Sequence, residues 1–270
     1  MPGLNWLDVS EINFNALLLL EPLHAAYLAE RQPEAAMGTA LTAHPAVHWF
    51  LARIHPPIQP YLDGCLALAE ADPTPEALRK AELEVLNSIQ DWLIYILDPH
   101  SYDKLKFLDW DDGSLLSMAD FTNKVVLDIG SGTGRLAFTV APQARVVYAV
   151  EPVANLRRFI RDKCTRMGLD NVYPIDGTLM QIPFEEGFAD ILMAGHVFGE
   201  DFEAEYHEMR RVVRDSGQIL LHPGTNAGRE DDAHRFLIAQ GFDFDTFEEP
   251  TDGLKRKYWQ TVHKLSTLKE

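Results

Sequence analysis

The chain has 270 residues, of which 46% are hydrophobic and 24% charged, so we expect a folded protein with a sizeable core. Its net charge of −17 argues against a nucleic acid or an anionic membrane surface as partner, because binding phosphates requires Lys and Arg. Two cysteines, Cys65 and Cys164, provide no disulfide framework.

The sequence contains no signal for a membrane or for secretion. The run Leu17–Leu20 is too short to span a bilayer, and no Lys or Arg precedes Arg31 as a secretory signal would require. We therefore expect a cytoplasmic protein. Residues 1–120 hold 6 Lys and Arg against 18 Asp and Glu. Solubility is the simplest explanation for this acidity, and a cationic substrate such as an amine is a second one.

Before residue 120 the hydrophobic periodicity is helical, and prolines separate the segments. Several segments begin near a proline, which suits the first turn of a helix. The Asp-rich run 109–114 is interpreted as a connector, so we predict a helical domain over 1–119 and a second domain over 120–270. The helices are predicted over Glu11–Arg31, Pro33–Ala43, Pro45–Ile54, Ile58–Ala71, Pro75–Leu97 and, less clearly, Tyr102–Phe107.

The second domain opens with the most informative stretch of the chain. An apolar run from Val125 to Ile129 predicts a buried strand, and it leads directly into the glycine-rich turn 130–134. Glycines at alternate positions let the backbone pass close to a ligand, and the helix expected over Arg135–Val140 presents unpaired amides to it. This pattern predicts a nucleotide pocket at the carboxyl end of the first strand.

Acidic residues at the ends of three predicted strands favour S-adenosylmethionine (SAM) over a dinucleotide. The glycine spacing is Asp-x-Gly-x-Gly-x-Gly from Asp128, and not Gly-x-Gly-x-x-Gly. Glu151 ends the second strand, 17 residues beyond Gly134, and can accept both ribose hydroxyls. Asp176, at the end of the third strand, can accept the exocyclic amine of adenine.

With these motifs the chain resembles the class I SAM-dependent methyltransferase family over about residues 120–268. The resemblance extends through strands predicted at Phe188–Ala194 and Ser216–Leu221, and through a terminal pair at Phe242–Glu248 and Lys257–Leu265. It implies an α/β fold, with a Rossmann-like seven-stranded, mostly parallel sheet and an antiparallel C-terminal strand, preceded by an all-helical N-terminal domain. It also implies the cofactor-binding residues Asp128, Gly130, Ser131, Gly132, Gly134, Glu151, Pro152, Asp176, Gly177, Gly195 and His196.

Two histidines are candidates for the catalytic base. His196 follows the fourth strand, whose end faces the methyl donor in the family, and imidazole can accept a proton near neutral pH. His222, at the end of the fifth strand, is the second candidate. A role in shaping the substrate site or bracing a loop remains open for His196. Glu200 and Asp201 are expected to begin the next helix.

No metal site is predicted. His44 and His48 lie four residues apart, but Pro45 places His44 at the helix start and no nearby carboxylate completes a ligand set. The run from Asp109 to Asp112 lacks the distal glutamate of a calcium loop.

We therefore predict a SAM-dependent methyltransferase that transfers a methyl group to a small-molecule acceptor by in-line displacement. The helical domain is expected to cap the substrate or to mediate a homodimer. Two alternatives remain: a SAM-binding regulatory protein without chemistry, and another nucleotide-dependent enzyme on a related fold, such as an NAD oxidoreductase or an aminopropyl transferase.

Overall fold

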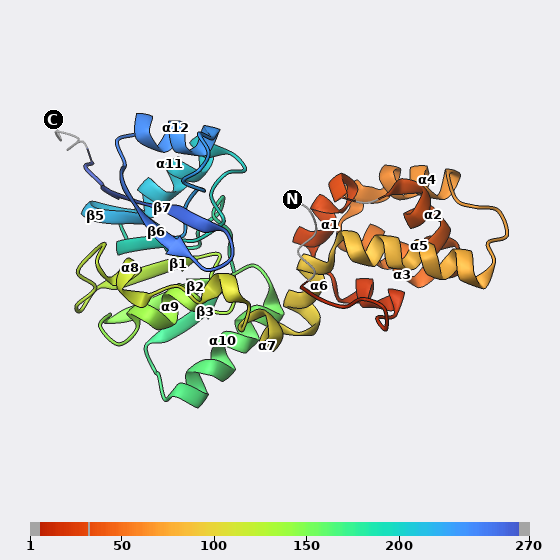
Figure 1. Ribbon diagram of the computed structural model, residues 1–270, viewed down its shortest axis with the longest axis horizontal. Coiled ribbons are helices and arrows are strands. Elements are labelled where there is room, and N and C mark those ends of the chain that lie inside the picture. Colours follow the sequence, from red (N-terminus) through yellow and green to blue (C-terminus); the bar gives the residue numbers. More distant parts are fainter. Residues whose placement is uncertain (1–5, 32, 265–270) are drawn as a thin grey trace. The chain divides into compact units, whose positions relative to one another are not determined.

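The computed structural model describes residues 6–31 and 33–264, and it divides into two compact units, Met1–Tyr102 and Asp103–Glu270 (Figure 1). The first unit is helical and the second contains a β-sheet. Within the described ranges, no helix combines the length and apolar character that crossing a membrane requires.

The helical unit is built from short helices that mostly begin at or next to proline. Its elements are η1 (Phe14–Leu19), α1 (Pro22–Arg31), α2 (Glu34–Ala43), α3 (Pro45–Ile54), η2 (Pro56–Ile58), α4 (Gln59–Ala67), α5 (Pro75–Ser88), α6 (Gln90–Leu97) and α7 (Pro99–Tyr102).

Two long helices predicted from the sequence are each divided in the structure. The segment Glu11–Arg31 splits because Pro22 begins a new helix. The segment Pro75–Leu97 splits at Ile89, next to Ser88, whose hydroxyl donates to the Val85 carbonyl oxygen and so competes with helical bonding. The helix predicted over Tyr102–Phe107 is absent, since α7 ends at Tyr102.

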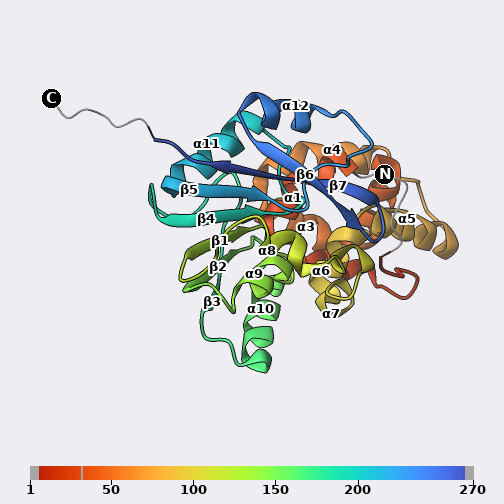
Figure 2. The same cartoon turned by 60° about the vertical axis from the view of Figure 1, so that its left-hand side comes forward.

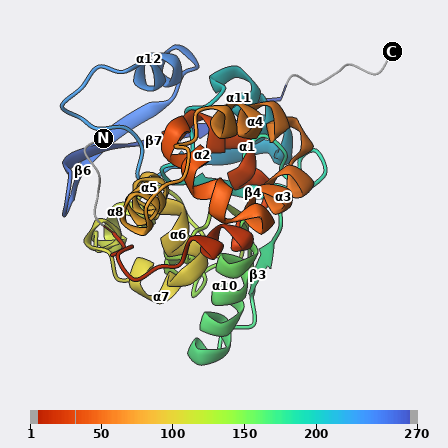
Figure 3. The same ribbon diagram turned by 90° about the vertical axis from the view of Figure 1, so that its right-hand side faces the viewer.

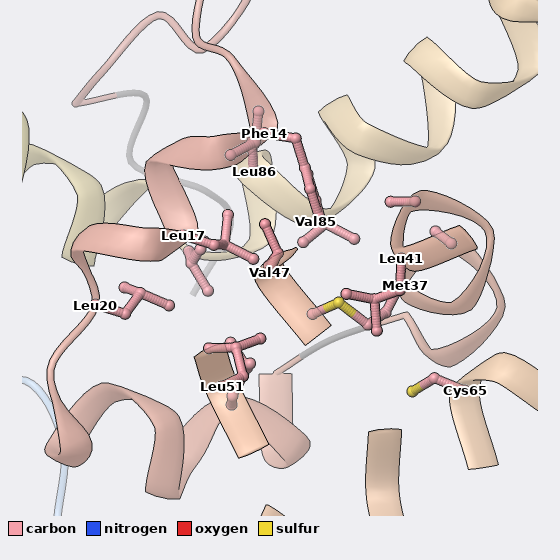
Figure 4. Close-up of a cluster of buried hydrophobic side chains, with 14 of the residues drawn as sticks. Phe14, Leu17, Leu20, Met37, Leu41, Val47, Leu51, Cys65, Val85 and Leu86 are labelled. Carbon is pink, nitrogen blue, oxygen red and sulfur yellow. The ribbon is translucent and has the colours of Figure 1, made fainter. Parts of the chain in front are cut away.

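The helical unit has its own hydrophobic core. Phe14 and Leu17 of η1, Leu51 of α3 and Leu86 of α5 are fully buried there (Figure 4). Helix α2 packs against both α4 and α5 (Figure 3). A Cβ atom at Gly38 of α2 would lie 1.8 Å from the Cys65 carbonyl oxygen of α4, so the close approach of these helices requires glycine.

The sheet unit alternates strands and helices, as expected for parallel pairing through crossover helices. Its elements are η3 (Lys106–Leu108), α8 (Asp112–Leu116), β1 (Val125–Ile129), α9 (Arg135–Val140), β2 (Val146–Val150), α10 (Ala154–Met167), β3 (Val172–Ile175), β4 (Ala189–Ala194), α11 (Phe202–Val212), β5 (Val213–Leu221), α12 (Asp232–Ala239), β6 (Asp243–Glu249) and β7 (Gly253–Thr261).

The seven strands form one sheet in the order β3-β2-β1-β4-β5-β7-β6. All adjacent pairs among β1 to β5 are parallel, and β7 pairs antiparallel with both β5 and β6. The predicted Rossmann-like sheet with an antiparallel C-terminal strand is therefore confirmed. Strand β7 begins at Gly253, before the predicted Lys257, and the predicted end at Leu265 lies outside the described residues.

Side chains alternate between two hydrophobic layers on either side of the sheet. Val126 of β1 packs in the layer with α8, α9 and α10, whereas its neighbour Leu127 packs in the layer with α11 and α12 (Figure 2). The central strand β1 is buried at all of its positions, so its carboxyl end is held firmly between helices.

The compact units meet between Tyr102 and Asp103, whereas the sequence analysis divided the chain after residue 119. Residues 103–119 join the sheet unit because Trp110, Leu115 and Met118 are buried in the layer that covers β1. In the Asp-rich run 109–114 the three aspartates are exposed, and the buried side chain of Trp110 anchors the run to the sheet unit.

Candidate active site

The glycine-rich turn after β1 has the left-handed conformation that its composition predicts. Gly130, Gly132 and Gly134 have φ values of 67°, 56° and 85°. A Cβ atom at Gly130 would lie 2.3 Å from a methyl carbon of Val197, and one at Gly134 would lie 2.6 Å from the ring of Phe138. Larger residues at these two positions would therefore distort both the turn and its neighbours.

Asp128 lies beneath this turn and is completely buried. Its Oδ2 atom accepts a hydrogen bond from the Ala137 amide at 3.0 Å, while the Ser131 hydroxyl donates to its carbonyl oxygen at 2.7 Å. Its Oδ1 atom has no partner. Burial raises the pKa of Asp128 to about 7. An unpaired buried carboxylate oxygen is costly, so this atom marks a position where a donor is missing.

Glu151 follows β2 and is only 4% exposed. Its Oε2 atom accepts from the Gly132 amide at 2.8 Å, and its Oε1 atom accepts from the Val153 amide at 2.9 Å. Burial raises the pKa of Glu151 to about 7. A carboxylate has about four lone-pair sites, so two of them remain for the hydroxyls of a ribose.

Asp176 follows β3 and is held by an arginine of α10. One guanidinium nitrogen of Arg157 donates to the carbonyl oxygens of Glu151 and Pro152, both at 2.7 Å, and to Asp176 Oδ1 at 3.0 Å. The Asp176 side chain is 73% exposed. It borders a hollow of about 630 Å³, which is also lined by Gly177, Thr178, Gln181, Ile182, Pro183, Phe184, Glu208 and Arg211.

The three predicted acids therefore end three adjacent parallel strands. Strand β1 pairs with β2 and β2 pairs with β3, which places Asp128, Glu151 and Asp176 along one edge of the sheet, with the glycine turn beside them. The remaining lone pairs of Glu151, the unpaired Asp128 oxygen and the open hollow beside Asp176 fit an adenosine-containing cofactor.

His196 lies in the loop after β4 and has a left-handed backbone with φ of 61°. Its side chain is exposed, and its ring contacts Phe107 edge to face at 5.8 Å between centroids. Burial by the surrounding protein and the charge of Lys255 lower the pKa of His196 to about 4. A ring that is exposed yet surrounded by protein lies in a concave site. Such a low pKa makes His196 a weak base.

His222 has a different environment from His196. It is fully buried between the rings of Trp110 and Phe247, at centroid distances of 4.4 and 4.3 Å. Its Nε2 atom lies 2.7 Å from the Ser114 hydroxyl. Burial and the charge of Lys257 lower its pKa to about 3. With both faces covered, the ring braces residues 110–114 against the sheet.

Arg135 was not among the predicted site residues, yet it fastens the segment before α8 to the helix that follows the glycine turn. Its guanidinium donates to the carbonyl oxygens of Leu108 and Trp110, both at 2.7 Å, and lies 3.8 Å from the Trp110 ring centroid. It also pairs with Asp112 at 2.6 Å. The signal in the sequence was an arginine at the first position of the helix, where basic side chains are unfavourable unless they have another partner.

A second feature absent from the sequence analysis is a small cavity at the carboxyl ends of β4 and β5. Its volume is about 50 Å³. It is lined by Ala194, His196, Phe198, Leu221, Pro223, Gly224, Thr225 and Leu237. These residues come from three separate elements, so no local sequence pattern predicts them together.

The loop from β4 to α11, which carries His196, is ordered by acidic side chains. Asp201 begins α11 as expected, and its side chain accepts from the Ala204 amide. Glu205 is 1% exposed and accepts from the amides of Gly199 and Glu200 at 2.8 and 3.0 Å. The loop therefore has a defined shape around the cavity.

In the helical unit, His44 contacts a carboxylate that the sequence analysis did not foresee. Its Nε2 atom lies 2.7 Å from Glu82, which also pairs with Arg79 at 2.8 Å. Arg79 in turn donates to the carbonyl oxygens of Ser10 and Ile12. Within residues 6–31 and 33–264, no three His, Cys, Asp or Glu side chains are grouped so that they could hold a metal ion. This network fastens the N-terminal segment to α5.

Comparison with known proteins agrees with this architecture. Residues 126–217 match a family model described as a methyltransferase domain. The similarity to methyltransferase domains therefore lies in residues 126–217, within the sheet unit. The matched residues begin within β1 and end within β5, so they include the glycine turn, all three acids and His196.

Several known proteins are similar to this chain over more than half of its length. An uncharacterized methyltransferase of Geobacillus kaustophilus is 29% identical over 167 residues, which are 58% of this chain and 72% of the relative. A demethylmenaquinone methyltransferase of Lactococcus lactis is 24% identical over 51% of this chain and 56% of its own. A solved structure of a SAM dependent methyltransferase from Aquifex aeolicus covers 60% of this chain and 98% of its own, with 16% identity and a TM-score of 0.47.

Proposed function

We propose that this protein binds SAM and transfers its methyl group to a small-molecule acceptor. The observation that carries the proposal is the row of three acids, Asp128, Glu151 and Asp176, at the ends of adjacent parallel strands beside a left-handed glycine turn. When bound, SAM would supply an electrophilic methyl group on a sulfonium.

Each residue of the site has a distinct role in this proposal. Glu151 accepts the ribose hydroxyls with its two remaining lone pairs, and the oxygens of Asp176 accept the adenine amine. The glycine turn lets its backbone approach the cofactor closely, as the left-handed φ values allow. Positioning of two reactants in line, with water excluded, is the main contribution that such a site makes to methyl transfer.

The acceptor is proposed to be a small molecule because the net charge of −17 disfavours nucleic acid. The mainly apolar cavity beside His196 fits one end of such an acceptor. With its low pKa, His196 is neutral at working pH, so it would position the acceptor and not draw a proton strongly. The helical unit as a cap or a dimer interface, and a cytoplasmic location, remain predictions.

Calorimetric titration tests the proposal. We expect SAM and S-adenosylhomocysteine to bind the full chain with micromolar affinity and NAD not to bind. Glu151→Ala should weaken binding of both sulfur nucleotides by at least tenfold, since two hydroxyls lose their acceptor. Glu248→Ala, an exposed acid on β6, is the matched control and should bind normally.

The outcomes separate the alternatives. Binding of NAD in place of the sulfur nucleotides would contradict the proposal and favour an oxidoreductase. SAM binding without methyl transfer to any compound in a panel of hydroxyl and amine acceptors would favour a regulatory protein.

A further inference from the structure

The cavity at the ends of β4 and β5 has one polar feature in its apolar wall besides His196. Its volume of about 50 Å³ leaves room for three or four water-sized groups. Ala194, Phe198, Leu221 and Leu237 supply apolar surface, and Thr225 supplies a hydroxyl. This hydroxyl is the first member of a hydrogen-bonded chain that leads away from the cavity.

The chain runs from Thr225 through Tyr258 to His234. The Thr225 hydroxyl lies 2.7 Å from the Tyr258 hydroxyl, which lies 2.9 Å from His234 Nδ1. Tyr258 is fully buried and His234 is 8% exposed. The three groups come from the loop after β5, from β7 and from α12. Each distance is short enough for a proton to pass between neighbours.

Only two directions of donation are consistent along this chain. Arg256 can only donate, and it gives one hydrogen bond to Thr225 Oγ1 at 3.1 Å. Tyr258 has a single proton, so it donates either to His234 or to Thr225. In the first case Thr225 donates to Tyr258, and its oxygen keeps a lone pair for a donor in the cavity. In the second case His234 donates and Thr225 points its proton into the cavity.

Glu230 favours the first direction. Its Oε1 atom lies 3.9 Å from His234 Nε2. The carboxylate attracts a proton on Nε2, whereas it would repel a lone pair on that nitrogen. With the proton on Nε2, Nδ1 is the acceptor for Tyr258. The other charged groups near the chain are Arg256, which lies 3.7 Å from Glu230, and Asp231, which acts on Tyr258.

We propose that Thr225, Tyr258 and His234 form a proton relay that accepts the proton of a hydroxyl or amine acceptor seated in the cavity. The proposal rests on the methyl-transfer function above. As the acceptor oxygen or nitrogen forms its bond to the methyl carbon, the methyl–sulfur bond breaks and its electron pair stays on sulfur. The acceptor's proton passes to Thr225, the Thr225 proton to Tyr258, and the Tyr258 proton to His234 Nδ1, which becomes imidazolium beside Glu230.

This relay provides a base in a site where the two histidines predicted from the sequence, His196 and His222, are weak bases. The pKa of His196 is lowered to about 4 and that of His222 to about 3. Thr225 would be the group that touches the acceptor, and Tyr258 and His234 act through it. The acceptor class that follows is small, mainly apolar at one end, and carries an ionisable O–H or N–H bond.

The direction of the chain can be measured without a cofactor or an acceptor. In nitrogen-15 NMR spectra of the full chain at neutral pH, we expect His234 as the Nε2–H tautomer, with Nδ1 shifted as a hydrogen-bond acceptor. Tyr258→Phe should remove this acceptor shift and mix the tautomers. Thr225→Ser keeps the hydroxyl and should preserve the wild-type spectrum. A His234 that is protonated at Nδ1 in the wild type would overturn the proposal.

Access of an acceptor to the hydrogen-bonded chain is tested with methanol, a hydroxyl probe small enough for a cavity of about 50 Å³. We expect it to shift the Ala194 and Leu237 methyl signals, and with them the His234 Nδ1 signal, in the wild type and in Thr225→Ser. In Thr225→Val the methyl signals should shift while Nδ1 does not. An equal Nδ1 response in Thr225→Val, or no methyl response at any probe concentration, would overturn the relay.

A final pair of results distinguishes the relay from the proposed function. If SAM fails to bind while the NMR results hold, the proposed methyl-transfer function is wrong. The hydrogen-bonded chain from Thr225 to His234 then exists but does not serve methyl transfer. If SAM binds but His234 is protonated at Nδ1, only the relay fails. Once an acceptor is found, Thr225→Val and Tyr258→Phe should lower kcat at least tenfold with a smaller change in KM, while the control Glu248→Ala on the exposed face of β6 stays near wild type.

Discussion

At the scale of single residues, two buried carboxyl groups lie under the glycine turn with few compensating charges. Asp128 bonds one amide and has an unpaired oxygen, and Glu151 bonds two amides. Burial raises the pKa of both groups to about 7, and the Asp128 charge contributes to the shift of Glu151. The buried negative charges of Asp128 and Glu151 therefore destabilise the folded protein, and a ligand with hydrogen-bond donors would reduce this destabilisation.

The raised pKa of Asp128 predicts how the stability of the folded protein depends on pH. Because the pKa of Asp128 is about 7 in the folded protein and 3.8 ordinarily, the native state holds the proton more tightly than the unfolded chain does. The contribution of the Asp128 carboxyl group to the free energy of unfolding is therefore present at low pH and is lost as the pH rises from about 4 to about 7. We expect Asp128→Asn to reduce this loss by on the order of 3 kcal/mol, as measured by chemical denaturation at pH 5 and pH 8.

The control for this measurement is Asp162→Asn on α10, where the side chain is exposed. It should follow the wild-type pH dependence. A fall in stability between pH 5 and pH 8 that is as steep in Asp128→Asn as in the wild type would mean that Asp128 is ionised in the folded protein throughout.

At the scale of elements, the segment before α8 depends on one arginine. Arg135 gives hydrogen bonds to the carbonyl oxygens of Leu108 and Trp110 and stacks on the Trp110 ring. Hydrogen bonds from a charged donor contribute about 1.5–3 kcal/mol each. Since the same side chain begins α9, the glycine turn and the segment 108–112 are coupled through it.

We expect Arg135→Gln to open this segment locally. Amide hydrogen exchange of residues 108–114 should accelerate by roughly 10- to 100-fold, which corresponds to the loss of about one charged hydrogen bond. Exchange in β4 and β5 should change little. Arg145→Gln is the matched control because Arg145 is exposed at the start of β2. Unchanged exchange over 108–114 in Arg135→Gln would contradict the coupling.

The elements also show which features the sequence could predict. Strand β1 and the glycine turn were predicted because burial of β1 on both faces leaves an unbroken apolar run, and the left-handed turn needs glycine. The packing of segment 103–119 on the sheet was not predicted, because the aspartates of 109–112 are typical of a solvated linker and Trp110 is the single large apolar residue among them. The hydrogen-bonded chain from Thr225 to His234 was not predicted either, because its members lie in the loop after β5, on β7 and on α12, which only the folded structure brings together.

At the scale of the whole molecule, the hydrophobic residues form separate cores. One cluster lies within residues 9–93, and the two layers of the sheet unit begin at Trp110. Among the described residues, the cluster within 9–93 and the two layers of the sheet unit share no member. Each unit therefore has the means to fold by itself, as expected of domains.

Two truncations test where the catalytic domain begins. The fragment 103–270 keeps Trp110, Leu115 and Met118, which are 4%, 0% and 9% exposed, and should unfold cooperatively in a thermal melt. The fragment 120–270 loses all three, together with the Ser114 and Ser117 partners of Lys257. Burial of a large apolar side chain is worth about 1.5–3 kcal/mol. The shorter fragment should therefore lose several kcal/mol, and should melt broadly or aggregate. Equal melting temperatures for the two fragments would place the boundary at residue 120 instead, and would mean that 103–119 packs on the sheet without stabilising it.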